Sequence, residues 1–246
     1  MSAPRQTVEV FVWPLAVVEP RFVALLELLS HEERARFESA ALPDRAREFV
    51  IGRGIARQLL GRRLGVAPPD VALTTSPHGR PGLADHPRAT LDFNLSHSGG
   101  IAAMAISTVG PCGIDIEAPR PLTSTLWGAA LSEAEREALE DLPEDDRTAG
   151  LFRRWVAKEA ILKGIGTGLS GHWRDMAVTV TPDAAATPPA QCVITLEGGR
   201  WPPDDGHEWR VRGFEPAAGF AGAVAVQSAE TEIALNVQSL DPNMDS

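Results

Sequence analysis

Short turns separate three apolar stretches between residues 91 and 117, and this spacing constrains the fold more than any other feature of the sequence. The stretches at 91–96 and 101–108 flank a turn at 97–100 (HSGG), and a Gly-Pro turn then leads into 113–117 (GIDIE). Strands that follow one another across such short turns pair antiparallel. Helical patterns lie before and after this group. The sequence therefore predicts an α+β fold rather than a doubly wound parallel sheet.

Apolar periodicity and capping residues place the other elements. Helices are expected at 23–37, 44–64, 132–139 and 147–163, and further strands at 7–13, 177–181, 192–196, 209–214 and 220–227. Ser30 is a candidate cap for the second part of the first helix, and Ser132 with Glu135 forms a capping-box pattern. Residues 229–246 are polar and mildly acidic, so we expect a mobile tail there.

Charge and composition exclude several classes of protein. The 246 residues carry a formal net charge of −10, whereas binders of nucleic acid or of anionic membranes present a basic surface. No apolar stretch is long enough to span a membrane, and the N-terminal segment lacks the order of a signal peptide. The two cysteines lie far apart and indicate neither a metal site nor a disulfide framework. We therefore expect a cytoplasmic protein.

Lysine is nearly absent from this chain. Lys158 and Lys163 are its only lysines among 23 basic residues, and they lie five positions apart. Lysine supplies a compact ammonium group that the planar fork of arginine does not imitate. Their presence in one helix therefore suggests a chemical role.

Two acidic patterns are candidates for metal binding. Asp115 and Glu117 lie two apart in a predicted strand, so both carboxylates project from one face, as Mg²⁺ ligands do. Taken alone, a solvent-facing strand edge explains the same pattern. Glu159 lies four positions before Lys163 on a helix and can complete such a site, although a surface ion pair is an equal explanation.

Other candidates concern phosphate binding. His97, beside Ser96, is a candidate general base or hydrogen-bond donor to phosphate, although a lone loop histidine is more often neither. A Ser-His-Asp triad lacks the required turn context, and the glycines after Lys163 end a helix rather than form a phosphate loop. Four arginines can neutralise phosphates or form a solvated basic face: Arg45, Arg53, Arg57 and Arg80.

The order of these motifs resembles that of the 4′-phosphopantetheinyl transferases, in the longer class that activates carrier proteins of peptide and polyketide synthases in secondary metabolism. The motifs are FVIGRGIAR (49–57), GRP (79–81), FNLSHSG (93–99), GIDIE (113–117) and WVAKEAILK (155–163), the last followed by GxGxGL. The resemblance extends from about Leu29 to Val226.

The resemblance implies roles for particular residues. Asp115, Glu117 and Glu159 would bind Mg²⁺, with Mn²⁺ as an alternative. Asp115, Glu159 and Lys163 would be the catalytic residues. Coenzyme A would contact the following residues: Arg45, Arg53, Arg80, Ser96, His97, Asp115, Lys158 and Lys163. Arg80 stands where lysine is frequent in the family.

The resemblance also implies a fold and a reaction. Two similar halves, each a small antiparallel sheet packed with a long helix, would span 1–108 and 109–228, and coenzyme A would bind between them in a monomer. The 4′-phosphopantetheine group would pass to a serine of an apo acyl- or peptidyl-carrier protein, releasing 3′,5′-ADP. Glu159, His97 or a metal-bound water would accept the serine proton.

Two alternatives remain, together with one expectation about docking. A Mg²⁺-dependent hydrolase of phosphates or diphosphates would share the acids but release product without an acceptor. A silent coenzyme A-binding module would bind but not react. Leu126 and Trp127 are candidates for the carrier-docking surface, because their segment links the two acidic motifs.

Overall fold

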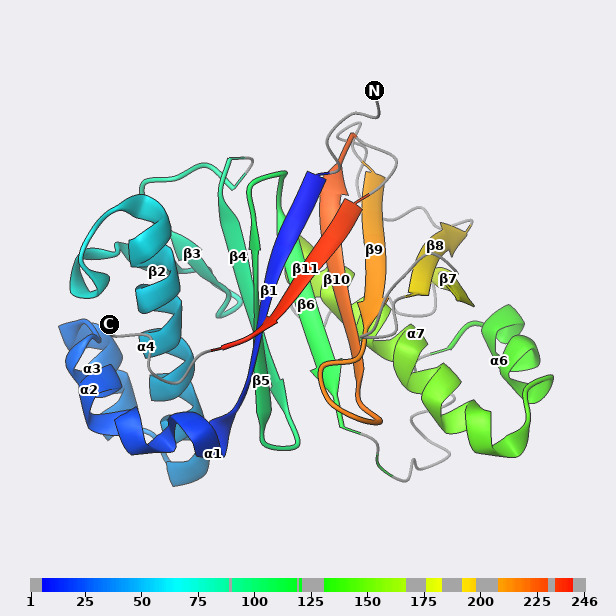
Figure 1. Ribbon diagram of the computed structural model, residues 1–246, viewed down its shortest axis with the longest axis horizontal. Helices are drawn as coiled ribbons and strands as arrows, with labels where there is room; N and C mark the ends of the chain where they lie inside the picture. The colour runs from blue at the N-terminus through cyan, green and yellow to red at the C-terminus, as the bar shows by residue number, and fades with distance from the viewer. Residues whose placement is uncertain are drawn as a thin grey trace.

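The computed structural model describes most of the chain, and the account below is confined to that part. The described residues are 6–88, 90–118, 120, 131–166, 176–182, 192–197, 208–229 and 233–240. Two sheets lie side by side at the centre, with one long helix on each outer flank (Figure 1). The prediction of an α+β fold built from two similar halves is confirmed.

The first half contains a long helix and a four-stranded sheet with the order β11-β1-β5-β4. Its helices are α1 (Leu15–Val18), α2 (Phe22–Glu27), α3 (His31–Glu38) and α4 (Pro43–Leu64), with short 3-10 turns at Glu19–Arg21 and Pro68–Asp70. Its strands are β1 (Gln6–Pro14), β2 (Leu73–Thr75), β3 (Pro81–Leu83), β4 (Asp92–Ser98) and β5 (Ile101–Ser107). Strands β2 and β3 form a separate small hairpin.

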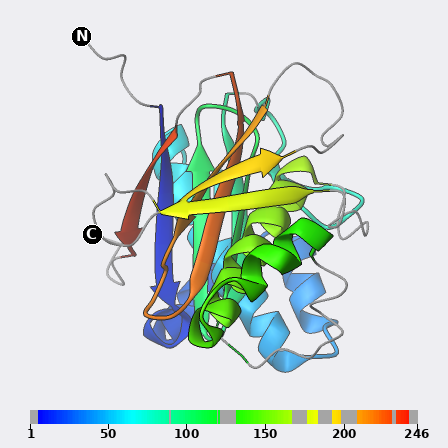
Figure 2. The ribbon, with the colours of Figure 1, turned by 90° about the vertical axis from the view of Figure 1, so that its right-hand side faces the viewer.

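The second half repeats this plan with a five-stranded sheet of order β6-β10-β9-β8-β7. Its elements are β6 (Cys112–Glu117), α6 (Glu133–Glu140), α7 (Glu144–Ile165), β7 (Ala177–Pro182), β8 (Cys192–Glu197), β9 (Glu208–Phe214) and β10 (Ala221–Ser228). The last strand, β11 (Ile233–Ser239), belongs to the sheet of the first half. Figure 2 shows α6 and α7 on the side of the molecule that faces the viewer, next to the yellow strands β7 and β8, and α7 packs on β6 and β10.

The two long helices begin and end in matching ways. Both α4 and α7 contain 22 residues, and each ends at a glycine in the left-handed conformation, Gly65 and Gly166. A short helix with a capping box precedes each of them, beginning after Ser30 in one half and Ser132 in the other. The helical stretch predicted over 23–37 consists of two helices, α2 and α3, and Ser30 caps the second of them as predicted.

The two sheets share an apolar core between them. Alternate residues of β1 and of β6 point into it and are almost completely buried. They are Val8, Val10 and Val12 from β1 and Cys112, Ile114 and Ile116 from β6. The residues between them lie on the opposite face of each sheet, on the side of the long helix of the same half. In β6 this face carries Asp115.

The outer edge of β6 is satisfied by side chains rather than by another strand. Alternate polar side chains of β4 accept hydrogen bonds from alternate backbone N–H groups of β6 and of the residue after it. The donor and acceptor pairs are Cys112 to Asp92, Ile114 to Asn94, Ile116 to Ser96 and Ala118 to Ser98, at 2.8–3.3 Å. Buried backbone donors need partners. The ladder therefore fixes β4 of the first half against β6 of the second.

The predicted mobile tail is wrong for Ile233–Ser239. These residues form β11, which pairs in parallel with β1 over seven positions. Ile233, Leu235 and Val237 alternate and pack against the apolar core between the sheets. This burial stabilises the strand despite its polar flanks, and it assigns β11 to the sheet of the first half. Within the described residues, no helix is long and apolar enough to cross a membrane.

Candidate active site

A cavity of about 670 Å³ lies where the two halves meet. We call it the cleft; it is lined by the N-terminal turns of α4, the end of β4, the end of β6 and one face of α7. Seven of the predicted site residues line it: Arg45, Ser96, His97, Asp115, Glu117, Glu159 and Lys163. The structure thus brings together, from both halves, most of the residues that the sequence motifs singled out.

A hydrogen-bonded group at the base of the cleft joins the two halves. Lys163 Nζ donates to Asp115 Oδ1 at 2.6 Å and to Ser96 Oγ at 2.9 Å. Ser96 Oγ in turn donates to Asp115 Oδ1 at 2.9 Å. Charge-assisted bonds of this length are the strong ones. They hold the ammonium of Lys163 at a defined place beside the carboxylate.

The acidic side chains of the cleft suit a divalent cation. Asp115 is buried, and its Oδ2 has no hydrogen-bond partner among the described residues, which is costly for a carboxylate oxygen unless a cation is bound. Glu117 and Glu159 line the same cavity. Among the described residues no three acids, histidines or cysteines already converge. Mg²⁺ requires no such cluster, because it takes one or two carboxylates and fills its shell with water and phosphate.

His97 stands at the rim of the cleft beside Glu48. Its Nδ1 lies 3.5 Å from Glu48 Oε2. Burial lowers the pKa of His97, the cations of Arg45 and Lys163 lower it further, and Glu48 opposes them. The imidazole is therefore predominantly neutral at pH 7 and has a nitrogen free to accept a proton or a hydrogen bond.

Glu48 and Ser98 are polar side chains of the cleft that the sequence analysis did not predict. Glu48 belongs to no motif, and only its place three positions after Arg45 on α4 indicates that it lies in the cleft. Ser98 donates to Glu117 Oε2 at 2.8 Å and so fixes that carboxylate. The alternation of Ser96 and Ser98 on one face of a strand was the signal that could have found the second serine.

A smaller cavity of about 300 Å³ adjoins the cleft and shares Arg45, Glu48, Leu95, Ser96 and His97 with it. We call it the side pocket. Its remaining walls combine apolar and basic groups: Trp13, Leu15, Arg36, Phe49, Gly52, Arg53, Gly79, Pro81 and Ala102. Such walls suit a flat aromatic group that carries negative charge.

Arg53 lies at the wall of the side pocket, with little of its side chain exposed. It donates to Thr75 Oγ1 at 3.4 Å, lies 3.6 Å from Glu33 Oε1 and stacks on the Phe49 ring at 5.4 Å. Burial lowers the pKa of this guanidinium. The guanidinium of Arg53 thus already contacts Thr75, Glu33 and Phe49, all of the first half.

Lys158 and Arg80 line neither cavity. Lys158 is completely buried, and its Nζ donates to Glu135 Oε2 at 2.6 Å; burial lowers its pKa. Arg80 donates instead to Asp92 and to backbone carbonyls of both halves. Leu126 and Trp127 lie outside the described residues.

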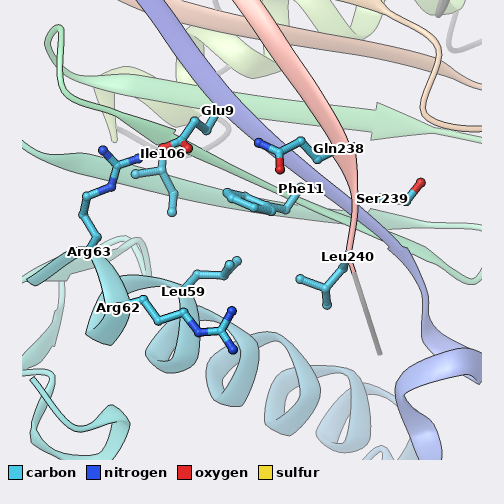
Figure 3. Close-up of a pocket in the computed structure, with 9 residues that line it drawn as sticks. All are labelled: Glu9, Phe11, Leu59, Arg62, Arg63, Ile106, Gln238, Ser239 and Leu240. Carbon is cyan, nitrogen blue, oxygen red and sulfur yellow. Dashed lines mark ion pairs between the residues drawn. The ribbon is translucent and has the colours of Figure 1, made fainter. Parts of the chain in front are cut away.

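A third cavity, of about 600 Å³, lies at the other end of α4 (Figure 3). We call it the far cavity. Its lining residues are Glu9, Phe11, Leu59, Arg62, Arg63, Ile106, Gln238, Ser239 and Leu240. The one acid among them, Glu9, is ion-paired with Arg63. The described residues of the far cavity therefore do not include a group of acids like that of the cleft, and the cleft is the candidate active site.

Comparison with protein families gives two matches that together cover most of the chain. The profile described as "4'-phosphopantetheinyl transferase superfamily" matches residues 111–224. The profile described as "4'-phosphopantetheinyl transferase, N-terminal" matches residues 16–109. The two matches meet between β5 and β6, where one half gives way to the other.

Individual proteins are similar over both halves. The chain is 36% identical to the 4'-phosphopantetheinyl transferase HetI of Nostoc sp., over 76% of this chain and 82% of HetI. It is 35% identical to a putative 4'-phosphopantetheinyl transferase of Synechocystis sp., over 65% of this chain and 66% of that protein. It is 30% identical to the 4'-phosphopantetheinyl transferase Sfp of Bacillus subtilis, over 58% and 67%.

Proposed function

Because the chain belongs to the 4′-phosphopantetheinyl transferase superfamily, we propose that it transfers the 4′-phosphopantetheine arm of coenzyme A to a serine of an apo carrier protein. The observation that supports this most is the composition of the cleft. The cleft is lined by Lys163, His97 and Arg45, which suit phosphates, and also by Asp115, Glu117 and Glu159, which suit a divalent cation. Coenzyme A presents both a diphosphate and a 3′-phosphate, so one substrate uses both sets.

The nucleotide end of coenzyme A fits the side pocket in this proposal. Phe49 and Trp13 offer apolar surface for the adenine, and Arg45 and His97 lie on the border with the cleft. The diphosphate then lies towards Lys163. Its ammonium stabilises the charge that develops on the leaving 3′,5′-ADP.

Asp115, Glu117 and Glu159 are the residues that would hold Mg²⁺, with Mn²⁺ as an alternative. When bound, the cation supplies positive charge to the diphosphate and so stabilises the leaving group. The buried free oxygen of Asp115 is the observation that favours a metal over a purely protein-based site.

The transfer makes one bond and breaks another. The carrier serine oxygen attacks the β-phosphorus, the bond to the bridging oxygen of 3′,5′-ADP breaks, and the serine proton leaves. Glu159 and the neutral imidazole of His97 both line the cleft and are the candidate proton acceptors. Since each chain contributes both halves of its own site, we propose that a monomer is active.

Intact mass spectrometry of an apo carrier protein incubated with the enzyme, coenzyme A and Mg²⁺ tests the proposal. We expect the carrier to gain the mass of one phosphopantetheine arm, and EDTA to prevent the gain. Release of 3′,5′-ADP without any carrier would instead indicate a hydrolase. Tight binding of coenzyme A with no mass gain on any carrier would indicate a silent binding module.

A further inference from the structure

Arg80 belongs to the tight turn of the β2–β3 hairpin and is directed into the protein. Its backbone N–H donates to Ser76 Oγ at 3.1 Å, and its carbonyl accepts from Ser76 N at 2.8 Å. Gly79, in the left-handed region at φ 84°, completes the turn. The residues on either side of Arg80, Gly79 and Pro81, line the side pocket, whereas Arg80 does not. The turn therefore directs the Arg80 guanidinium away from the place where a nucleotide would lie.

The guanidinium of Arg80 connects four separate elements. It donates to the carboxylate of Asp92 and to four backbone carbonyls, at 2.8–3.1 Å. The carbonyls belong to Pro81 of β3, Phe93 of β4, Cys112 of β6 and Lys163 of α7. Asp92 is itself buried and also accepts from the backbone N–H of Cys112 at 2.8 Å. Arg80 is thus bonded to both halves at once.

The bond to α7 concerns the same residue whose ammonium lies in the cleft. Arg80 Nε donates to the carbonyl of Lys163 at 2.9 Å. Carbonyls in the last turn of a helix lack intrahelical partners and interact favourably with a cation. Arg88 donates to the next carbonyl, that of Gly164, and shares Asp92 with Arg80. A Cβ on Gly166 would lie 3.2 Å from Arg80 Cδ, so the two segments are in close contact.

We propose that Arg80 is a positioning residue that acts through Lys163, rather than a contact to coenzyme A. By fixing the Lys163 backbone to β4 and β6, it sets where Nζ meets Ser96 and Asp115. A direct contact to a nucleotide phosphate would require the guanidinium to leave Asp92 and carbonyls that are buried. This inference rests on the proposed function, which assigns Lys163 its role in stabilising the leaving group.

A double-mutant cycle tests the inference, with R80M, K163M and R80M/K163M compared with the wild type. Misplacing a catalytic group by about 1 Å costs on the order of 10²-fold, so we expect R80M to lower the turnover number by about that factor. In the K163M background the same substitution should change turnover by no more than about twofold, the scatter found for uncoupled sites. Equal factors in both backgrounds would overturn the inference.

A second measurement separates positioning from nucleotide contact. Binding of coenzyme A is compared with binding of free 4′-phosphopantetheine, which lacks the nucleotide. Positioning predicts that R80M weakens both to the same extent, whereas a nucleotide contact predicts loss for coenzyme A alone. R62M, an exposed arginine of α4 that lines only the far cavity, is the control and should leave both affinities unchanged.

If R80M does not fold, R80K carries the cycle. Lysine keeps the charge but has no planar fork, so it cannot bond to β4, β6 and α7 together. We expect R80K to fold and to show a smaller loss that again vanishes in the K163M background; a loss that persists there contradicts the inference. A wild type that binds coenzyme A but transfers nothing would contradict the proposed function. The affinities of R80M for coenzyme A and for 4′-phosphopantetheine would still test the positioning.

Discussion

The two halves place a buried ion pair at the same point of the scaffold. In the first half the capping-box acid Glu33 bonds Arg57, and in the second Glu135 bonds Lys158, at 2.8 and 2.6 Å. Arg57 and Lys158 each occupy the fifteenth position of a 22-residue helix. The pair that joins the short helix to the long one is therefore a repeated part of the fold. Lys158 belongs to this framework rather than to the cleft.

The halves differ one turn further along the helix. Lys163 and Arg62 both occupy the twentieth position, but Lys163 reaches Asp115 whereas Arg62 lines the far cavity. In β6 the residue between Ile114 and Ile116 is an aspartate. In β1 the residues between the buried valines are Glu9, which is ion-paired with Arg63, and Phe11. The second half thus carries the Lys163–Asp115 pair of the cleft, whereas in the first half Arg62 and Phe11 line the far cavity.

The largest effect is expected from Glu159→Gln. The substitution removes a carboxylate from the cleft, and we expect transfer to fall by roughly 10²–10⁴-fold, the range for loss of a group that moves a proton or stabilises the transition state. The thermal unfolding midpoint should change little, because the shape is conserved. Turnover measured on a carrier protein checks this, and near wild-type turnover would remove Glu159 from the site.

The comparison of Lys163→Met with Arg62→Met sharpens the contrast between the halves. Loss of the Lys163 ammonium should lower kcat/KM by on the order of 10²-fold, as for other groups that stabilise developing charge. Arg62→Met should leave kcat/KM within about twofold, because exposed surface substitutions are close to neutral. Comparable losses in both variants would break the proposed asymmetry.

The repeated ion pairs should behave alike in stability measurements. Lys158→Met leaves the buried carboxylate of Glu135 without its partner, so we expect a loss of about 3–5 kcal/mol in the free energy of unfolding. Arg57→Met should cost less, because Glu33 is more exposed than Glu135. Urea unfolding measures both.

The double variant Lys158→Met with Glu135→Met is the matched control. Replacing both members of a buried pair by apolar residues is often close to neutral, so it should regain most of the lost stability and retain affinity for coenzyme A. Wild-type stability of Lys158→Met combined with weakened coenzyme A binding would show that Lys158 contacts the substrate after all.

The smallest effect concerns pH. The pKa of His97 is lowered in the folded protein, so below its unfolded value near 6.5 the unfolded chain binds more protons than the folded one. Stability should therefore be fully present above that pH and decline as the pH falls towards and through the folded pKa. His97→Gln should flatten this part of the stability curve. An unchanged curve would mean that His97 does not contribute to it.

The sequence predicted local pattern well and long-range contact poorly. Alternation in GIDIE placed Asp115 and Glu117 in the same cavity, because strand periodicity is local. Five positions on a helix correspond to about 140° beyond a full turn, so Lys158 and Lys163 face different ways; the spacing contained that information, although both were assigned to coenzyme A.

Other features depended on partners far along the chain. Arg80 bonds acceptors up to 83 positions away, which no local pattern reveals. In β11 the alternation of Ile233, Leu235 and Val237 was present in the sequence, but only the neighbouring strand β1 and the core between the sheets make it a strand. Tertiary packing decides such short, polar-flanked segments.

The account places one site in each chain, in the cleft between the two halves, and this is tested most directly by calorimetric titration of coenzyme A into the protein with Mg²⁺ present. The account predicts one molecule bound per chain, with binding weakened by Lys163→Met and unchanged by Arg62→Met. Two molecules per chain, or binding that Arg62→Met weakens as much as Lys163→Met does, would contradict it.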